Sequence, residues 1–190
     1  MRANYLVAFS DSSSGKELWG FKTTSGKIAI GPKYEYVLGL DTLYSMAMVM
    51  LNSKWVAINK HDSVLLTPYI FDNGPDYVQE GLFRFVENNK IGFANAKGQK
   101  VILAQFDFAA PFSEGLAAFS VGGKMEKWDE EHSNWKGGLW GFINKRGQVV
   151  IKPQYAKAFD FSGSTCEVWT KDNKRILIDK KGRIVKVLSK

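Results

Sequence analysis

One segment recurs five times along this chain, and this recurrence constrains the fold more than any other feature. The copies start at Trp19, Trp55, Ile91, Trp140 and Arg175 and read WGFKTTSGKIAIGPKY, WVAINKHDSVLLTPYI, IGFANAKGQKVILAQF, WGFINKRGQVVIKPQY and RILIDKKGRIVKVL. Successive starts are 36, 36, 49 and 35 residues apart. A fixed period of this size indicates a repeat architecture, in which each unit is too small to bury its own apolar face and packs on its neighbours. The long interval therefore contains an insertion of about 13 residues, at about 122–138.

Each copy has the pattern of a β-hairpin. In the fourth copy, residues 139–143 form an aromatic and β-branched run that is typical of a strand. Asn144 then starts a turn and Gly147 takes its left-handed position, which is typical of a short hairpin loop with a bulge. The second copy has Asp62 at the glycine position, where Asp is tolerable because it enters the left-handed region more readily than most residues. The other copies hold the same two offsets as Thr23 and Gly26, Asn95 and Gly98, and Asp179 and Gly182.

A return strand and a third strand follow each turn. Residues 149–151 form the return strand, and Pro153 ends it because proline cannot donate a hydrogen bond to the ladder. Pro32 and Pro68 have the same offset. In the third copy a connector ending in the letters PFSEG leads to a third strand at 116–119. We therefore predict three antiparallel strands in each unit.

Both faces of these strands carry apolar residues. In the fourth copy Trp140 and Phe142 point to one face, whereas Leu139 and Ile143 point to the other. A strand with one face in water would alternate apolar and polar residues more regularly. Each small sheet is therefore expected to lie between two neighbouring units.

The two ends of the chain suggest how the repeats are arranged. The fifth copy supplies two strands, 175–179 and 183–188, while residues 5–9 near the start resemble a third strand. Pairing this first strand with the last unit would close a ring and remove exposed strand edges. We predict an all-β fold in which residues 1–190 form one domain, a closed, propeller-like ring of five three-stranded units. The alternative is an open β-solenoid.

These residues also carry a family resemblance. The recurring WGF, the N-K-x-G hairpin, the VVIKPQY return strand and the FSEGLAAF connector resemble the WG (KWG) repeat, a bacterial family, from about residue 18 to 185. The resemblance implies a β-rich repeat module without an established shared activity or catalytic motif. The copies depart from the family pattern at four positions, with Ile91 in place of tryptophan, Val56 in place of glycine, and Arg175 and Ile176 in place of both.

Composition agrees with a single compact domain inside the cell. The chain has 190 residues, of which 45% are hydrophobic and 14% aromatic, enough to bury a sizeable core. No apolar run is long enough to span a bilayer, and residues 1–14 lack the pattern of a signal peptide, so we expect a cytoplasmic protein. The single cysteine, Cys166, cannot form an internal disulfide and is expected to be a small buried hydrophobe.

Motifs for catalysis are missing from the sequence. His61 and His132 are the only histidines, and neither has neighbours that would make a metal site or a nucleophile and base pair. The acidic run 129–131 is most simply a solvated surface, and no glycine-rich phosphate loop is present. We therefore expect a protein that is not an enzyme and has no cofactor.

The net charge of +7 raises the question of a polyanionic partner. Lysines spread over hairpin turns usually serve solubility. If the turns of successive units line up on one rim, they would form a basic ring suited to an acidic protein or a phosphate backbone. Nucleic acid is nevertheless not the expected partner, because no RNA-binding aromatic motif, helix-turn-helix or zinc spacing is present. The residues of this ring are Lys60, Lys97, Lys145, Arg146, Lys180 and Lys181.

The insertion is the one segment that the repeat does not explain. It reads GGKMEKWDEEHSNWKGG and carries Trp128 and Trp135 between paired glycines. It is either a longer hairpin whose tryptophans pack back on a neighbouring unit, or a loop that anchors a partner. A second candidate is a groove for a sugar or an extended peptide, although the regular spacing of its residues favours core packing. This groove would comprise Trp19, Trp55, Trp140, Phe21 and Phe142.

The sequence thus predicts a non-enzymatic β-repeat module that binds a protein partner. The alternative is recognition of a polyanion or a cell-wall glycan through basic turns and aromatic grooves. Strong salt dependence of binding would favour the polyanion, whereas retention of a protein at high salt would favour the module. The predicted partner-binding residues are Trp128, Trp135, Lys145, Arg146, Lys180 and Lys181.

Overall fold

The computed structural model describes residues 5–39, 42–71, 73–127 and 133–189. All regular secondary structure in this part of the chain is β-strand. It contains no helix that is long and apolar enough to cross a membrane. The predicted all-β class is confirmed.

The described strands form five antiparallel meanders, which we number from the N-terminus. Each meander has an outer strand, a middle strand that starts with the WG position, and a return strand. The first meander consists of β1 (Leu6–Asp11), β2 (Leu18–Thr23) and β3 (Ile28–Tyr34). The second consists of β6 (Ala47–Leu51), β7 (Lys54–Ile58) and β8 (Val64–Pro68), and the third of β11 (Leu82–Glu87), β12 (Lys90–Asn95) and β13 (Lys100–Phe106). The fourth is β15 (Leu116–Val121), β18 (Leu139–Asn144) and β19 (Val149–Tyr155), and the fifth is β21 (Thr165–Trp169), β22 (Arg175–Asp179) and β23 (Ile184–Ser189).

Short strands tie each meander to the next. After a return strand, the chain crosses over and pairs with the outer strand of the following meander. In this way β4 (Tyr36–Leu38) pairs with β6, β14 (Phe108–Ala109) with β15, and β20 (Lys157–Ala158) with β21. The end of β8 pairs directly with β11, which joins the second and third meanders into one seven-stranded sheet. The remaining strands are β5 (Thr42–Leu43), paired with β1, and the two-stranded pairs β9 (Ile70–Phe71) with β10 (Gly74–Pro75) and β16 (Lys124–Lys127) with β17 (Ser133–Lys136).

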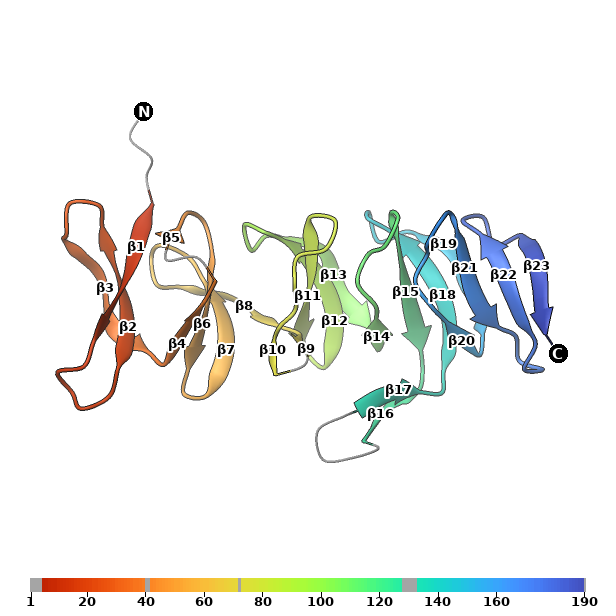
Figure 1. The fold of residues 1–190 in the computed structure, drawn as a ribbon, viewed down its shortest axis with the longest axis horizontal. Coiled ribbons are helices and arrows are strands. Elements are labelled where there is room, and N and C mark those ends of the chain that lie inside the picture. Colours follow the sequence, from red (N-terminus) through yellow and green to blue (C-terminus); the bar gives the residue numbers. More distant parts are fainter. Residues whose placement is uncertain (1–4, 40–41, 72, 128–132, 190) are drawn as a thin grey trace.

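The five meanders stand in an open row, with the two chain ends at opposite ends of it (Figure 1). An apolar cluster fills each of the four junctions between successive meanders. Between the fourth and fifth, for example, Trp140 and Phe142 pack with Val168 and Ile178. The other face of the fourth meander presents Phe119 and Ile143 to the third. The prediction that each small sheet lies between two neighbours, with both faces apolar, holds for the second, third and fourth meanders and is wrong for the first and the fifth, which each pack on one described neighbour.

The predicted closed ring is wrong. Strand β1 pairs with β2 along its length and with β5, so the first strand belongs to the first meander and not to the last. The prediction assigned residues 116–119 to the unit of the preceding hairpin, but β15 pairs with the following middle strand, β18. Each unit therefore starts one strand earlier than predicted. With this phase the fifth meander already has three strands, and the chain needs no ring to complete it.

The glycine of the WG position lies under a bulge of the return strand. Trp140 is paired with Tyr155 and Phe142 with Ile151, so that three residues of β19 cross over Gly141 alone. A Cβ atom on Gly141 would lie 2.4 Å from the carbonyl oxygen of Ile151. Gly20 has the same environment, whereas the second meander accepts Val56 because β8 leaves β7 before it reaches this point. Glycine is thus required where the bulge crosses the middle strand.

The hairpin turns form as predicted and also contact the preceding meander. In the fourth meander, Asn144 Oδ1 accepts hydrogen bonds from the backbone N–H groups of Arg146 (2.9 Å) and Gln148 (3.1 Å), and Gly147 has a φ of 76°. A Cβ atom on Gly147 would approach Ile102 Cγ2 to 2.9 Å, because the turn packs on the third meander. In the second meander Asp62 takes the left-handed conformation, with a φ of 64°. Its carboxylate accepts hydrogen bonds from Lys33 and Tyr34 of the first meander.

Candidate functional site

The insertion forms a β-hairpin, β16–β17, that projects from the lower edge of the row in Figure 1. Two glycine pairs form its neck, and all four residues have positive φ. A Cβ atom on Gly138 would lie 2.4 Å from the carbonyl oxygen of Gly122, so the two backbone segments of the neck lie too close together here for side chains. The N–H of Gly122 also donates to Asp107 Oδ2 at 2.8 Å. These contacts attach the hairpin firmly to the fourth meander.

Trp135 packs back from the hairpin onto the scaffold. Its ring stacks on Phe108 with a centroid distance of 5.3 Å and an interplanar angle of 18°. Phe108 in turn packs edge-on against Trp140, with ring centroids 5.7 Å apart. The indole Nε1 of Trp135 is buried beside Gly123 and has no hydrogen-bond partner among the described residues. The other tryptophan of the insertion, Trp128, lies outside the described residues.

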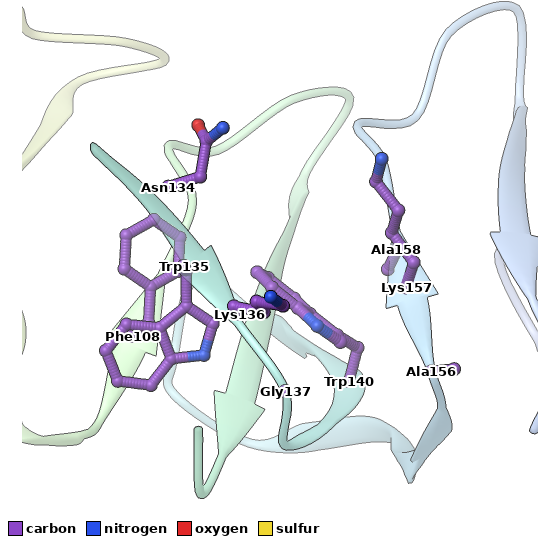
Figure 2. A pocket seen from close by; sticks show the side chains of 9 residues that line it. All are labelled: Phe108, Asn134, Trp135, Lys136, Gly137, Trp140, Ala156, Lys157 and Ala158. Carbon is purple, nitrogen blue, oxygen red and sulfur yellow. The ribbon is translucent and has the colours of Figure 1, made fainter. Parts of the chain in front are cut away.

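A cleft of about 440 Å³ opens between this hairpin and the fifth meander. Figure 2 shows the ring of Trp140 lying between Trp135 of β17 on one side and Lys157 and Ala158 of β20 on the other. The surface is thus an aromatic floor with a lysine on each side. The complete lining is Phe108, Asn134, Trp135, Lys136, Gly137, Trp140, Ala156, Lys157 and Ala158.

Two of the strands that line the cleft each have one edge without a partner strand among the described residues. Within the described residues, β17 pairs only with β16, and β20 pairs only with β21. Residues of both strands line the cleft. Backbone donors and acceptors are therefore available on either side of the aromatic floor.

The lysines of the cleft differ in their partners. Lys136 forms an ion pair with Glu126 at 2.9 Å, and Lys124 shares the same carboxylate at 3.1 Å. Hydrogen bonds from these two lysines hold the pKa of Glu126 below its usual range. Lys157 has no ion pair among the described residues, and its ammonium group lies 4.7 Å from the ring centre of Phe159. The described charges around the cleft are thus predominantly positive.

Two lysines of the predicted basic turns, Lys145 and Lys180, form ion pairs between meanders. Lys145 Nζ lies 3.0 Å from Glu80 Oε2 and donates to the backbone oxygen of the same residue at 2.9 Å. Lys180 Nζ lies 3.1 Å from Glu114 Oε2. The lysine hydrogen bonds lower the pKa of both glutamates. Each glutamate also accepts a backbone N–H from the next connector, Gly115 for Glu80 (3.0 Å) and Ser164 for Glu114 (2.9 Å).

The structure does not bring Trp135 and the predicted cations to one surface. The insertion joins the start of β18, whereas Lys145 and Arg146 follow its end, and the two sets lie on opposite long edges of the row (Figure 1). Arg146 and Lys181 are exposed in their turns. The turns follow one another along one edge of an open row, so they form no ring.

The alternative groove of regularly spaced aromatics is not formed. Trp19, Trp55 and Trp140 belong to different meanders, and Trp140 retains only 8% exposure. Phe21 and Phe142 are fully buried in separate junctions. Four of these residues pack in junctions between meanders, as their spacing favoured, whereas Trp55 packs against Tyr36.

The sequence analysis missed Phe108 and Lys157 as lining residues. Both lie two residues after the last aromatic of a return strand, at the position that Tyr36 occupies in the first copy. Tyr36 packs edge-on against Trp55 at 5.7 Å, just as Phe108 does against Trp140. The repeat register therefore contained a signal: this position contacts the WG tryptophan of the next unit.

A buried ion pair was also missed. The guanidinium of Arg84 binds Asp76 through Nε (2.8 Å) and Nη2 (2.7 Å), and its Nη1 donates to the backbone oxygen of Ala109 (3.0 Å). The two side chains are 3% and 2% exposed. These hydrogen bonds engage three of the five N–H donors of the guanidinium, and the buried pair links the third meander to β14.

Cys166 and the acidic residues form no reactive group in the described part of the chain. Burial raises the pKa of the Cys166 thiol to about 11, and Sγ donates to the backbone oxygen of Phe159 at 2.9 Å. No three histidine, cysteine, aspartate or glutamate residues come close enough to hold a metal ion within these residues. The run 129–131 and His132 lie outside them.

Comparison with protein families identifies the repeat. The WG containing repeat family matches residues 19–55, 91–124 and 140–168, more than half of the chain. The chain belongs to this family. All three matched WG repeat segments contain a glycine that lies under the return strand, Gly20, Gly92 or Gly141. A search of curated proteins finds no match.

Proposed function

We propose that this WG repeat chain is a non-enzymatic binding module that holds a protein partner in the cleft between the insertion hairpin and the fifth meander. The observation that carries the proposal is the aromatic floor, in which Trp135 stacks on Phe108 and faces a cleft of about 440 Å³. Tryptophans on a rigid scaffold are frequent anchors of protein interfaces. The cleft lies beside the insertion, which is the segment that the repeat does not contain.

The contacts of the basic turns favour a protein over a polyanion. Lys145 and Lys180 are paired with Glu80 and Glu114, which reduces the positive charge available along that edge. The cleft on the opposite edge is lined mainly by aromatic and aliphatic groups. A polyanion or cell-wall glycan remains the competing function, and it would use the exposed cations of the turns.

The test is affinity purification of the full chain from extracts of its own cells. We expect a stoichiometric protein that stays bound at high salt with the wild type and is lost with Trp135→Ala. Leu103→Ala is the matched control, because this exposed apolar side chain lies on β13, away from the cleft. The charge reversal Arg146→Glu with Lys181→Glu should leave the complex intact. Retention by Trp135→Ala, or capture of nucleic acid or glycan that salt releases, would contradict the proposal.

A further inference from the structure

We propose that the partner enters the cleft as an extended peptide strand that pairs with the free edge of β17 and carries carboxylates beside a large apolar side chain. This inference rests on the proposed protein-binding function and specifies the chemistry of its partner. It is independent of the basic turns on the opposite edge.

The free strand edges indicate an extended polypeptide. Strand β17 belongs to a sheet of two strands, so one of its edges has no partner among the described strands, and Asn134, Trp135 and Lys136 of this strand line the cleft. A two-stranded hairpin is only marginally stable in water, so a third strand would stabilise it. Strand addition supplies affinity through main-chain hydrogen bonds and specificity through pockets for alternate side chains. A glycan has no row of amides at this spacing.

The aromatic floor indicates one large apolar side chain. Phe108, Trp135 and Trp140 converge on the cleft, as Figure 2 shows, and Ala158 adds a small apolar surface opposite them. An aromatic or branched aliphatic group from the partner would cover rings that are already held by mutual packing. A rigid aromatic pocket of this kind loses little entropy on binding.

The charges indicate acidic residues on either side of that group. Lys157 lies on the β20 side without an ion pair among the described residues, and Lys136 lies on the β17 side. Lys136 shares Glu126 with Lys124, so two ammonium groups face one carboxylate. In an extended strand, residues two apart point to the same face, so the carboxylates are expected two positions before and two positions after the apolar residue, with a residue of any kind between them.

The first experiment is selection from a phage-displayed library of random dodecapeptides on the immobilised full chain. We expect the enriched peptides to carry acidic residues two positions before and two positions after a large apolar residue. A synthetic copy of an enriched peptide should bind at least about tenfold more weakly to Lys157→Glu, whereas Lys157→Arg should retain binding. Lys157 is exposed, and a thermal unfolding curve of each variant checks that it is folded.

The second experiment tests strand pairing directly, with peptides that are N-methylated on alternate amides. In an added strand, every second N–H faces β17 and the others face away. Methylation of one alternating set should weaken binding by at least about tenfold, while methylation of the other set changes it little. Equal effects of the two sets would overturn strand pairing, because a peptide bound through side chains alone has no such alternation.

The outcomes separate this inference from the proposed function. Enrichment of basic or proline-rich peptides would overturn the partner chemistry. No enrichment, with a whole protein still captured in a manner that depends on Trp135, would overturn the extended strand and leave the binding module standing. No enrichment and no Trp135-dependent capture would overturn both.

Discussion

The fourth and fifth meanders have the same strand order but use equivalent positions in opposite ways. Trp140, Phe142 and Ile151 of the fourth meander are buried against the fifth. At the equivalent positions the fifth meander carries Arg175, Leu177 and Lys186, on a face where no other described sheet packs. Arg175 there forms a bidentate ion pair with Glu167, at 2.8 Å and 3.1 Å.

The difference indicates what the WG signature is for. A face that no neighbouring sheet covers is expected to be polar, because nothing there buries an apolar one. The middle strand β22 forms without tryptophan or glycine and still pairs with both of its neighbours. The signature is therefore a requirement of the junction between meanders and of the bulge that crosses it. The strand itself does not require it.

The largest expected effect compares Trp140→Ala with Arg175→Ala. Removing the buried Trp140 ring should lower the free energy of unfolding by about 3 to 5 kcal/mol, because it leaves a cavity in a junction. Arg175→Ala should cost less than about 1 kcal/mol, since exposed ion pairs contribute little. Urea unfolding followed by far-UV circular dichroism measures both. Equal losses would mean that the outer face of the fifth meander is as tightly packed as an inner junction.

A second prediction concerns the glycine under the bulge. Gly141→Ala should lower the free energy of unfolding by about 2 to 3 kcal/mol, because its Cβ atom would meet the backbone of β19 and force a shift. Gly31→Ala is the matched control, since a Cβ atom there meets nothing within 4 Å. Its effect should stay within about 0.5 kcal/mol. If both substitutions have the same effect, the close approach at Gly141 does not explain the WG glycine.

The third prediction separates stability from binding at the insertion. Trp135→Ala removes one stacked ring from a surface hairpin, so the free energy of unfolding should fall by only about 1 kcal/mol. Capture of the protein partner should nevertheless be lost, because interface anchors are few and often tryptophan. Thermal unfolding and a binding titration of the same variant give the two values. A loss of stability as large as that of Trp140→Ala would make the hairpin part of the core.

The strands and turns that local sequence determines were predictable. The prediction was wrong about which three strands form one meander. The turn at Asn144 and Gly147 fixes the pairing of β18 with β19, because the two strands are joined by a short loop. A second signal was available in Asn88–Asn89, which link β11 to β12 with φ values of 51° and 59°. Adjacent positive φ values mark a two-residue hairpin turn. These asparagines would have placed the outer strand before the middle strand and removed the reason for a ring.

The cleft depends on contacts that the sequence does not order. Its lining comes from β14, β17, β18 and β20, and only the stack of meanders brings them together. Of the two alternatives for the insertion, the structure shows a hairpin, and its Trp135 packs back on Phe108. The edge on which this hairpin lies follows from which strands are assigned to the same meander. The prediction grouped the basic turns with the tryptophans as partner-binding residues, whereas the structure places Trp135 and the basic turns on opposite edges (Figure 1).

The smallest expected effect concerns the lysine–glutamate contacts between meanders. Glu80 and Glu114 both have a φ of 50°, an unusual conformation for glutamate, and their side chains reach Lys145 and Lys180 of the next meander. These lysines hold the pKa of both carboxyls below its ordinary value of 4.5 in the folded chain. The unfolded chain therefore binds protons more readily, and the stability from these contacts is present above that value and lost as the pH falls through the folded pKa.

The double variant Glu80→Gln with Glu114→Gln should therefore lose part of the acid sensitivity of the row. Between about pH 6 and pH 3, the urea midpoint of the wild type should fall further than that of the variant. Glu17→Gln, in the exposed turn between β1 and β2, is the control and should follow the wild type. Because the glutamates are partly exposed, solvent and salt weaken these contacts, and the difference should shrink as salt is added. If the double variant shows the same acid sensitivity as the wild type, the contacts of Glu80 and Glu114 do not contribute to it, and Lys145 and Lys180 remain available to a polyanion.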